Sequence, residues 1–195
     1  NRALDARRDL GDIFTPFIYA AAEERGLQPR FEQPLSTGRD IGSEDLVRLA
    51  KRFGFEGPFL QGDDLFRGGV SATPLEVVTA VATLTQEGQR PRTHFLRDLR
   101  DSGSNPILSI EPSSKSMFAE HATRAALAMQ FPGGEPRLMV GINSAKTDVW
   151  GVSFGSMHAI CVWVGYDKPS RLDGMETIRK EVHKTIQRMA LNLMP

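Results

Sequence analysis

The sequence has little of what would place it in several common protein classes. It holds one cysteine in 195 residues, Cys161, so no disulfide can form within the chain. Its 24 Lys and Arg residues are balanced by 24 Asp and Glu residues, so no overall positive field attracts nucleic acid or an anionic membrane surface. No apolar run reaches the ~18 residues of a membrane-spanning helix. We therefore expect no disulfide framework, no nucleic-acid partner and no transmembrane segment in this chain.

What the sequence does contain is typical of a globular domain. Hydrophobic residues make up 40% and charged residues 25% of the chain, and its length suits one sizeable core. We expect a single domain over residues 1–195. The chain begins without a methionine and in the middle of a recognisable pattern, which predicts that it is a fragment of a longer protein.

Acidic and glycine-rich residues between positions 62 and 69 could suggest a metal or phosphate site. The stretch Gly62-Asp63-Asp64 is followed by Gly68-Gly69, but it lacks the spacing of a calcium-binding EF-hand. It also lacks the Lys-Ser/Thr pair of a phosphate-binding loop. We therefore expect neither a metal nor a cofactor.

The periodicity of apolar residues predicts a mixture of helices and strands. Loops or extended segments are predicted over 27–43, 56–72 and 90–112. Helices are predicted over 43–53 with Ser43 as N-cap, from Thr73 with a capping box, over 113–130 with Ser113 or Ser114 as cap, and over 174–193. Three short apolar segments, 137–142, 149–154 and 159–164, are separated by short connections and should pair as antiparallel strands. The sequence therefore predicts an α+β fold in which an antiparallel sheet is flanked by helices.

The stretch from Gly11 to Ala22 is the most informative part of the chain. Phe14, Phe17, Ile18 and Ala21 fall on one apolar helical face, and a proline at position 16 is tolerated in a first turn. Asp12 is placed where its carboxylate could cap the helix. From the residues alone, this is the start of a buried helix.

Together with the residues before it, this stretch resembles a segment of class A, bifunctional penicillin-binding proteins. The sequence reads NRA-x-x-A-R-R-x-x-G-D-x-F-T-P-F-x-Y, and the family segment reads FNRA-x-x-A-x-R-x-x-G-S-x-F-K-P-F-x-Y. Residues 69–88 and the strands 148–154 and 161–167 resemble further family segments. The resemblance implies the fold of the penicillin-binding transpeptidases and serine β-lactamases, with the N-terminal strands of that domain missing from this chain.

The three catalytic motifs of that family are altered. The Ser and Lys of the motif S-x-x-K correspond to Asp12 and Thr15, and the motif S-x-N corresponds to Ser36 with Gly38 in place of Asn. The motif K-T-G corresponds either to Ile142, Asn143 and Ser144 or to Lys146, Thr147 and Asp148.

No serine anywhere in the chain has a lysine three residues later. Since acylation needs a hydroxyl activated by a nearby base, we expect no catalytic residues. The possible cleft is formed by Asp12, Thr15, Ser36, Ser144, Lys146 and Thr147.

The resemblance implies a role outside the cytoplasm, at the periplasmic face of the bacterial inner membrane. The leading interpretation is an inactive binding or scaffolding module in peptidoglycan synthesis, whose partners are a stem peptide or other cell-wall synthesis proteins. An upstream glycosyltransferase domain and a membrane anchor would lie outside this chain. Two alternatives stay open. One is an active DD-transpeptidase or carboxypeptidase that uses Ser36 or Ser144, and the other is a protein-interaction domain unrelated to the cell wall.

Overall fold

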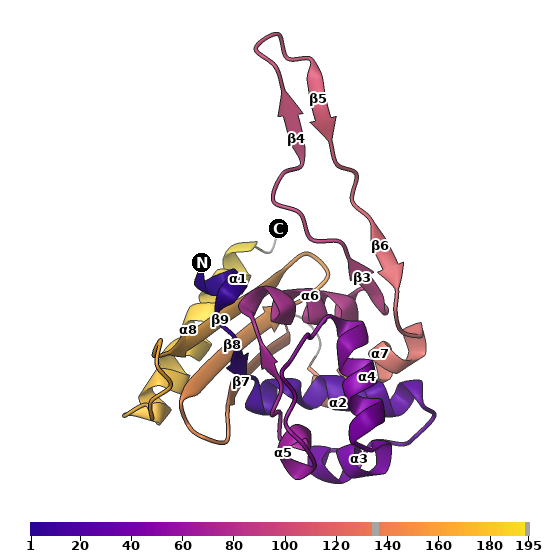
Figure 1. Cartoon of the computed structure of the whole chain (residues 1–195), viewed down its shortest axis with the longest axis vertical. Coiled ribbons are helices and arrows are strands. Elements are labelled where there is room, and N and C mark those ends of the chain that lie inside the picture. Colours follow the sequence, from indigo (N-terminus) through magenta and orange to yellow (C-terminus); the bar gives the residue numbers. More distant parts are fainter. Residues whose placement is uncertain (134–136, 194–195) are drawn as a thin grey trace.

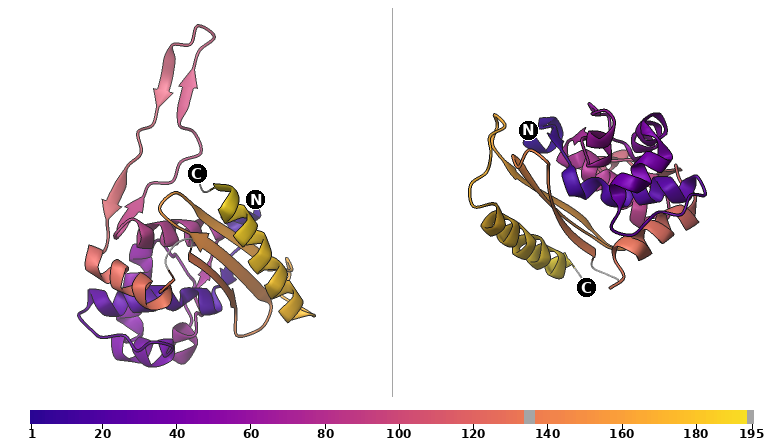
Figure 2. Two further views of the ribbon diagram at one scale, coloured as in Figure 1. Left: turned by 180° about the vertical axis from the view of Figure 1, so that it is seen from behind. Right: turned by 90° about the horizontal axis from the view of Figure 1, so that it is seen from below.

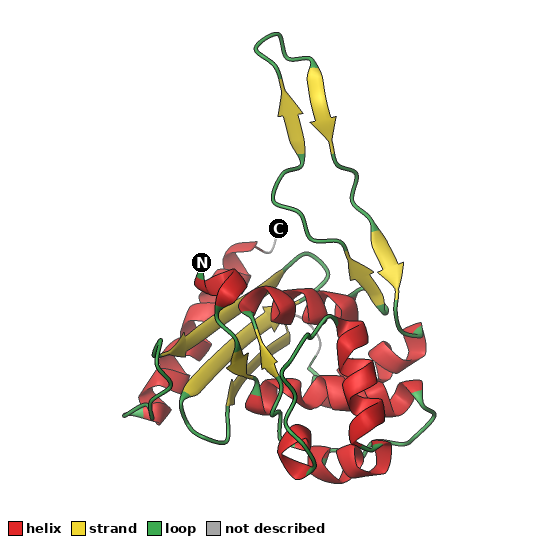
Figure 3. Ribbon diagram, in the orientation of Figure 1, coloured by secondary structure: helices red, strands yellow, loops and turns green. Residues whose placement is uncertain are grey.

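The computed structural model describes residues 1–133 and 137–193. They form a sheet covered on one face by a single long helix and on the other by a layer of shorter helices (Figures 1 and 2). A narrow two-stranded arm extends far from this body (Figure 3). The arrangement is the α+β architecture that the sequence predicts.

The central sheet consists of β7 (Arg137–Ile142), β8 (Asp148–Phe154) and β9 (Ala159–Gly165) in the order β7-β8-β9. Both strand pairs are antiparallel, so the predicted hairpin pairing is confirmed, with β8 and β9 each extended by one residue. Every residue of the middle strand β8 is buried. The Trp150 indole on β8 lies opposite Trp163 on β9.

The long helix α8 (Met175–Leu193) covers one face of the sheet (Figure 2). Its buried residues are Val182, Ile186 and Ala190, which recur every four residues. This spacing places them on one side of the helix, where they pack against the strands. The helix predicted over 174–193 is therefore confirmed.

The opposite face is covered by the helical layer. It contains α1 (Arg2–Asp5), the 3₁₀ turn η1 (Gly11–Phe14), α2 (Thr15–Glu24), α3 (Pro34–Ile41), α4 (Ser43–Phe53), α5 (Asp63–Phe66), α6 (Pro74–Thr85) and α7 (Glu120–Gln130). A short antiparallel ribbon pairs β1 (Arg8–Asp9) with β2 (Ser71–Ala72).

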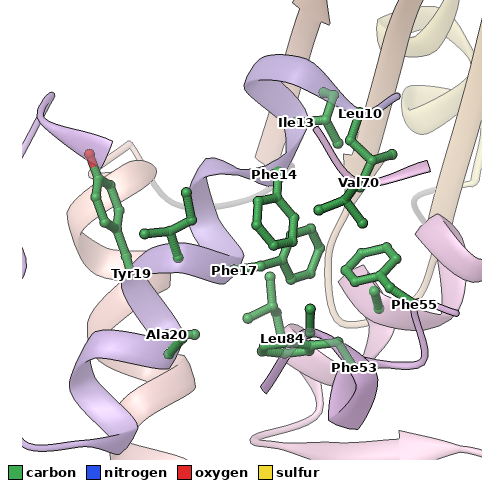
Figure 4. Close-up of a cluster of buried hydrophobic side chains, with 14 of the residues drawn as sticks. Leu10, Ile13, Phe14, Phe17, Tyr19, Ala20, Phe53, Phe55, Val70 and Leu84 are labelled. Carbon is green, nitrogen blue, oxygen red and sulfur yellow. The ribbon is translucent and has the colours of Figure 1, made fainter. Parts of the chain in front are cut away.

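An aromatic cluster between α2 and α4 forms the centre of this layer (Figure 4). The Phe17 ring meets both Phe53 and Phe55 edge-on, with 5.0 Å between ring centroids in each pair. Phe14 contacts Phe55 in a similar geometry. Edge-to-face contacts of this kind stabilise by about 0.5–1.5 kcal/mol beyond area burial. These ring contacts therefore hold helix α2 in the core.

Helix α6 begins as its sequence predicts. The Thr73 hydroxyl accepts the Glu76 N–H, and the Glu76 carboxylate accepts the Thr73 N–H. This reciprocal capping box satisfies two of the four backbone donors that a helix start leaves unpaired. Pro74 occupies the first turn, where its missing N–H costs nothing.

Two of the predicted loops contain helices, and one predicted helix cap is wrong. Residues 34–41, predicted as loop, form α3 with Pro34 in its first turn, and the predicted loop 56–72 contains α5 and β2. Ser43 is the first residue of α4 rather than its cap, because the N-cap position is Gly42. Local composition missed α3 because its Ser, Thr and Gly residues are poor helix formers that tertiary packing overrides.

A further difference from the sequence prediction lies in the arm. Its base pairs β3 (Gln89–Pro91) with β6 (Ser114–Ser116), and its outer part pairs β4 (Asp98–Arg100) with β5 (Pro106–Ser109) (Figure 1). The prediction of a helix starting at Ser113 or Ser114 is therefore wrong: these residues approach or belong to β6, and α7 begins at Glu120 after an Ala119 N-cap. The pairing of β6 with β3, about 25 residues earlier, overrides the local sequence pattern that favours a helix start.

Within residues 1–133 and 137–193, no helix is both long and apolar enough to cross a bilayer. The same residues contain no group of three His, Cys, Asp or Glu side chains arranged to hold a metal ion.

Candidate functional site

The site is built where η1 presses against the edge of β7. Gly141 on β7 makes this approach possible, because a Cβ there would lie 2.8 Å from the Ile13 backbone nitrogen and 3.1 Å from Asp12 Cβ. Real side chains do not tolerate such distances to backbone. The close approach brings the Asp12 side chain beside Ile142 at the end of the strand.

Asp12 does not cap a helix. No side-chain capping bond is present at the start of η1 or α2, so that prediction is wrong. Instead, the Asp12 carboxylate accepts the backbone N–H of Ile142, with 3.3 Å between nitrogen and Oδ2. The carboxylate is exposed and occupies a strand-edge donor that would otherwise face the adjoining cavity.

A cavity of about 270 Å³ adjoins this contact. It brings together four of the predicted positions, Asp12, Thr15, Ile142 and Ser144, although they come from segments 130 residues apart. We call this cavity the cleft. Its remaining wall comes from the start of α3 and from the end of α5. A smaller cavity of about 200 Å³ shares Ser144 with the cleft and is also lined by Asn143.

Arg67 lines both cavities and was not identified from the sequence. It follows α5 directly, so the helix aims it toward the cleft. The neighbouring Asp63 is already paired with Arg39, whose Nε lies 2.9 Å from its carboxylate. Hydrogen bonding to Arg39 lowers the pKa of Asp63, and the charge of Arg67 contributes to the same shift. Within the described parts of the chain, Arg67 makes no side-chain hydrogen bond or ion pair, so it presents its charge to a ligand.

Ser36 and Gly38 are close to the cleft on α3 but do not line it. The Ser36 hydroxyl accepts a hydrogen bond from Arg30. Gly38 is buried beneath the ring of Phe66, and a Cβ at position 38 would lie 2.6 Å from Phe66 Cδ1. Any side chain at position 38 would therefore have to displace Phe66.

The turn between β7 and β8 is fixed by a buried polar network. The Asn143 amide donates to Thr147 Oγ1 at 2.9 Å and to Asp148 Oδ2 at 2.8 Å. The Asp148 carboxylate also accepts the Trp163 indole N–H at 2.9 Å and pairs with Arg8. These side chains are committed to holding the turn, and their hydrogen-bonding capacity is largely used.

Lys146 lies in the same turn, exposed and with a φ of +58°. Neither Lys146 nor Thr147 lines the cleft. Of the six residues predicted to form the cleft, the structure therefore assembles three, Asp12, Thr15 and Ser144, and places Ser36, Lys146 and Thr147 outside its lining.

A known protein resembles this chain in sequence. No protein-family model matches the chain. It is similar to penicillin-binding protein 2D of Bacillus subtilis (strain 168), with 25% identity over 165 residues, which cover 75% of this chain and 24% of that protein. The chain thus spans about a quarter of the length of this relative.

Solved structures resemble the whole chain. Penicillin-binding protein 1A of Haemophilus influenzae superposes with a TM-score of 0.79 at 16% identity, covering 97% of this chain and 43% of that one. The D,D-transpeptidase domain of a peptidoglycan glycosyltransferase from Eggerthella lenta gives a TM-score of 0.69 at 12% identity, covering 99% and 68%. The chain has the fold of a penicillin-binding transpeptidase domain. The resemblance inferred from the opening residues is confirmed at the level of fold.

In a transpeptidase domain of this fold, acylation needs a nucleophile with a base beside it and donors for the developing oxyanion. In η1 this chain offers the Asp12 carboxylate and, one turn later at the first residue of α2, the Thr15 hydroxyl. A hydroxyl cannot act as the base, and acyl transfer to a carboxylate would give a labile anhydride. Asp12 and Thr15 therefore do not form a pair of hydroxyl and amine base, and the polar side chains that line the cleft include those of Arg67, Ser144 and Thr15.

Proposed function

We propose that this transpeptidase-type domain binds a ligand of peptidoglycan synthesis without acylating it. The observation that carries the proposal is the placement of Asp12. It lies in η1 directly before α2, lines the cleft, and its carboxylate accepts the backbone N–H of Ile142 at the edge of β7. Thr15, one turn later, supplies no amine. Acyl transfer to a carboxylate at this position would give a labile anhydride rather than a stable ester.

The ligand class follows from the cleft. Arg67 supplies an unpaired guanidinium, which binds carboxylates through two parallel hydrogen bonds, and Ser144 and Thr15 supply hydroxyls. A peptide ending in a carboxylate, such as a peptidoglycan stem peptide, fits this set. We place the domain outside the cytoplasm, in a longer protein that also carries a glycosyltransferase domain and a membrane anchor. There it acts as a binding or scaffolding module among cell-wall synthesis proteins.

Labelling with fluorescent penicillin tests the loss of acylation. The purified chain is incubated with the reagent, denatured and run on a gel, beside an active penicillin-binding protein as positive control. We expect no covalent fluorescence above that of the heat-denatured chain. Stoichiometric labelling would overturn the proposal.

Titration with a stem peptide tests the binding site. We expect Arg67→Gln to weaken the affinity at least fivefold. Arg188→Gln on α8, an exposed arginine across the sheet from the cleft, should leave it within twofold. If the two variants bind equally, Arg67 is not the anchor.

A second candidate function is an active transpeptidase or carboxypeptidase that uses Ser144, since its hydroxyl lines the cleft. Ser36 is less suited, because its hydroxyl is bonded to Arg30 outside the lining. Fluorescent labelling that disappears in Ser144→Ala would favour this candidate. The third reading, an interaction domain unrelated to the cell wall, would be favoured if the chain is not retained on purified peptidoglycan.

A further inference from the structure

A second cavity, of about 690 Å³, lies where the arm joins the body. Its walls come from the end of α4, the start of α6 and the paired strands β3 and β6 at the base of the arm (Figure 1). It shares no residue with the cleft described above. Its size is within the range of small-molecule binding pockets and is far larger than a single ion needs.

Four cations from three elements converge on this cavity: Lys51 from α4, Arg90 and Arg92 from β3 and the residue after it, and Lys115 from β6. Arg90 and Lys115 are directly opposite each other in the strand pair. Side chains at opposed antiparallel positions lie on the same face, and like charges there are destabilising. The base of the arm therefore carries a pair of like charges.

The acidic residues in the cavity offset this charge only in part, because two carboxylates share one arginine. Glu56 and Glu76 also line it, but Arg7 binds both, with its Nη2 at 2.8 Å from Glu56 and 2.6 Å from Glu76. One of the three positive charges introduced by the arm is held in place, since Arg90 donates to the Arg52 carbonyl at 3.1 Å at the end of α4.

The other cations have no acidic partner. Across the described residues, Arg92 and Lys115 make no side-chain hydrogen bond or ion pair, and Lys51 contacts only the Phe59 ring, with 5.8 Å to its centroid. Hydroxyls of Thr93, Ser113 and Ser114 line the same wall. Guanidinium, ammonium and hydroxyl groups around one cavity supply many hydrogen-bond donors, and these donors match the oxygens of a phosphate group.

We propose that the cavity at the base of the arm binds a phosphate-bearing anion. The ligand carries at least two negative charges, because Arg7 cancels only one of the two carboxylates and the four lining cations still leave an excess of about three positive charges. Arg92 and Lys115 contact the phosphate oxygens, and Arg90, fixed by α4, orients the wall. Because this site shares no residue with the cleft, the proposal does not depend on the function proposed above.

Calorimetric titration with inorganic pyrophosphate tests the site. We expect the Arg92→Gln/Lys115→Gln double variant to weaken the dissociation constant at least tenfold. Arg97→Gln, on the arm but outside the cavity, should stay within twofold of the unchanged chain. Citrate, a carboxylate anion of similar charge, should bind at least fivefold more weakly than pyrophosphate.

Thermal unfolding distinguishes lost binding from lost folding. Removing Lys115 relieves its repulsion with Arg90, so Lys115→Gln should unfold at the same or a higher temperature without ligand, yet gain less stability from pyrophosphate. Sedimentation with phosphatidylglycerol vesicles identifies the source: retention lost in the double variant indicates a lipid headgroup, and binding to pyrophosphate alone indicates a soluble phosphate. Equal affinity of the double variant and Arg97→Gln, or citrate binding as tight as pyrophosphate, would overturn the proposal.

Discussion

Replacing Gly38 by alanine is the sharpest test of how the wall of the cleft is built. The added Cβ would lie 2.6 Å from Phe66 Cδ1, 2.7 Å from Cγ and 2.8 Å from Cβ. Carbon atoms in good contact are separated by about 3.5–4.0 Å, so the two residues must move apart by roughly 1 Å. Rotating the ring is not enough, because Phe66 Cβ is fixed to the backbone of α5.

Two opposing effects set the magnitude. Alanine in the interior of α3 gains about 1 kcal/mol over glycine in helix propensity. Forcing an extra carbon into a filled interior costs about 1–3 kcal/mol, and here the obstacle includes a backbone-attached atom. We expect overpacking to win, with a net loss of about 1–2 kcal/mol in the free energy of unfolding. For a chain of this length that lowers the melting temperature by roughly 3–6 °C.

The assay is urea unfolding of four chains: the unchanged sequence, Gly38→Ala, Phe66→Ala and the double variant. Without the ring, two of the three close atoms are gone and α5 can relax. The cost of Gly38→Ala should then fall to near zero, which gives a coupling energy of about 1–2 kcal/mol. Gly133→Ala serves as control, since a Cβ there meets no atom within 4 Å. The reasoning fails if Gly38→Ala is neutral in the unchanged chain, or if it costs the same with and without the Phe66 ring.

Three further predictions concern stability. Asp148→Asn should cost about 2–3 kcal/mol in urea unfolding, because a buried carboxylate that accepts three side-chain hydrogen bonds loses its charge; a cost below 0.5 kcal/mol would contradict this. Thr73→Ala should cost about 1 kcal/mol by removing the capping box, whereas an unchanged urea midpoint would show that the cap adds nothing. Arg39 lowers the folded-state pKa of Asp63, so this pair stabilises above the unfolded pKa of about 4 and stops doing so as the pH falls through the folded value. Arg39→Gln should flatten the acid side of the pH–stability curve, and an identical curve would refute the assignment.

Local patterns in the sequence predicted the elements that are determined by residues close together in the chain. The apolar spacing of α8, the capping box of Thr73 and the short connections among β7, β8 and β9 each depend on residues a few positions apart. These signals depend on helix geometry, strand length and turn length alone. The elements that they predict appear in the structure with nearly the expected bounds.

The site could be predicted only in part, because its contacts join distant segments. The cap predicted for Asp12 is replaced by a bond to Ile142, 130 residues away, and this competition is invisible in the local sequence. Ser114 pairs with Pro91 across the arm, so its signal for a helix start is overridden. Arg67 carries no motif at all, and only the position of α5 makes it part of the cleft.

Gly38 on α3 and Arg67 in the cleft are linked through the packing of α5. Phe66, the last residue of this helix, fills the space that a side chain at position 38 would need, and Arg67 follows it directly into the cleft. The glycine on α3 and the guanidinium in the cleft are therefore consequences of one packing arrangement. An alanine at position 38 that pushes Phe66 aside must also shift Arg67. We accordingly expect Gly38→Ala to weaken stem-peptide binding along with stability, whereas Thr73→Ala, which destabilises the chain far from α5, should leave the affinity of the folded chain unchanged.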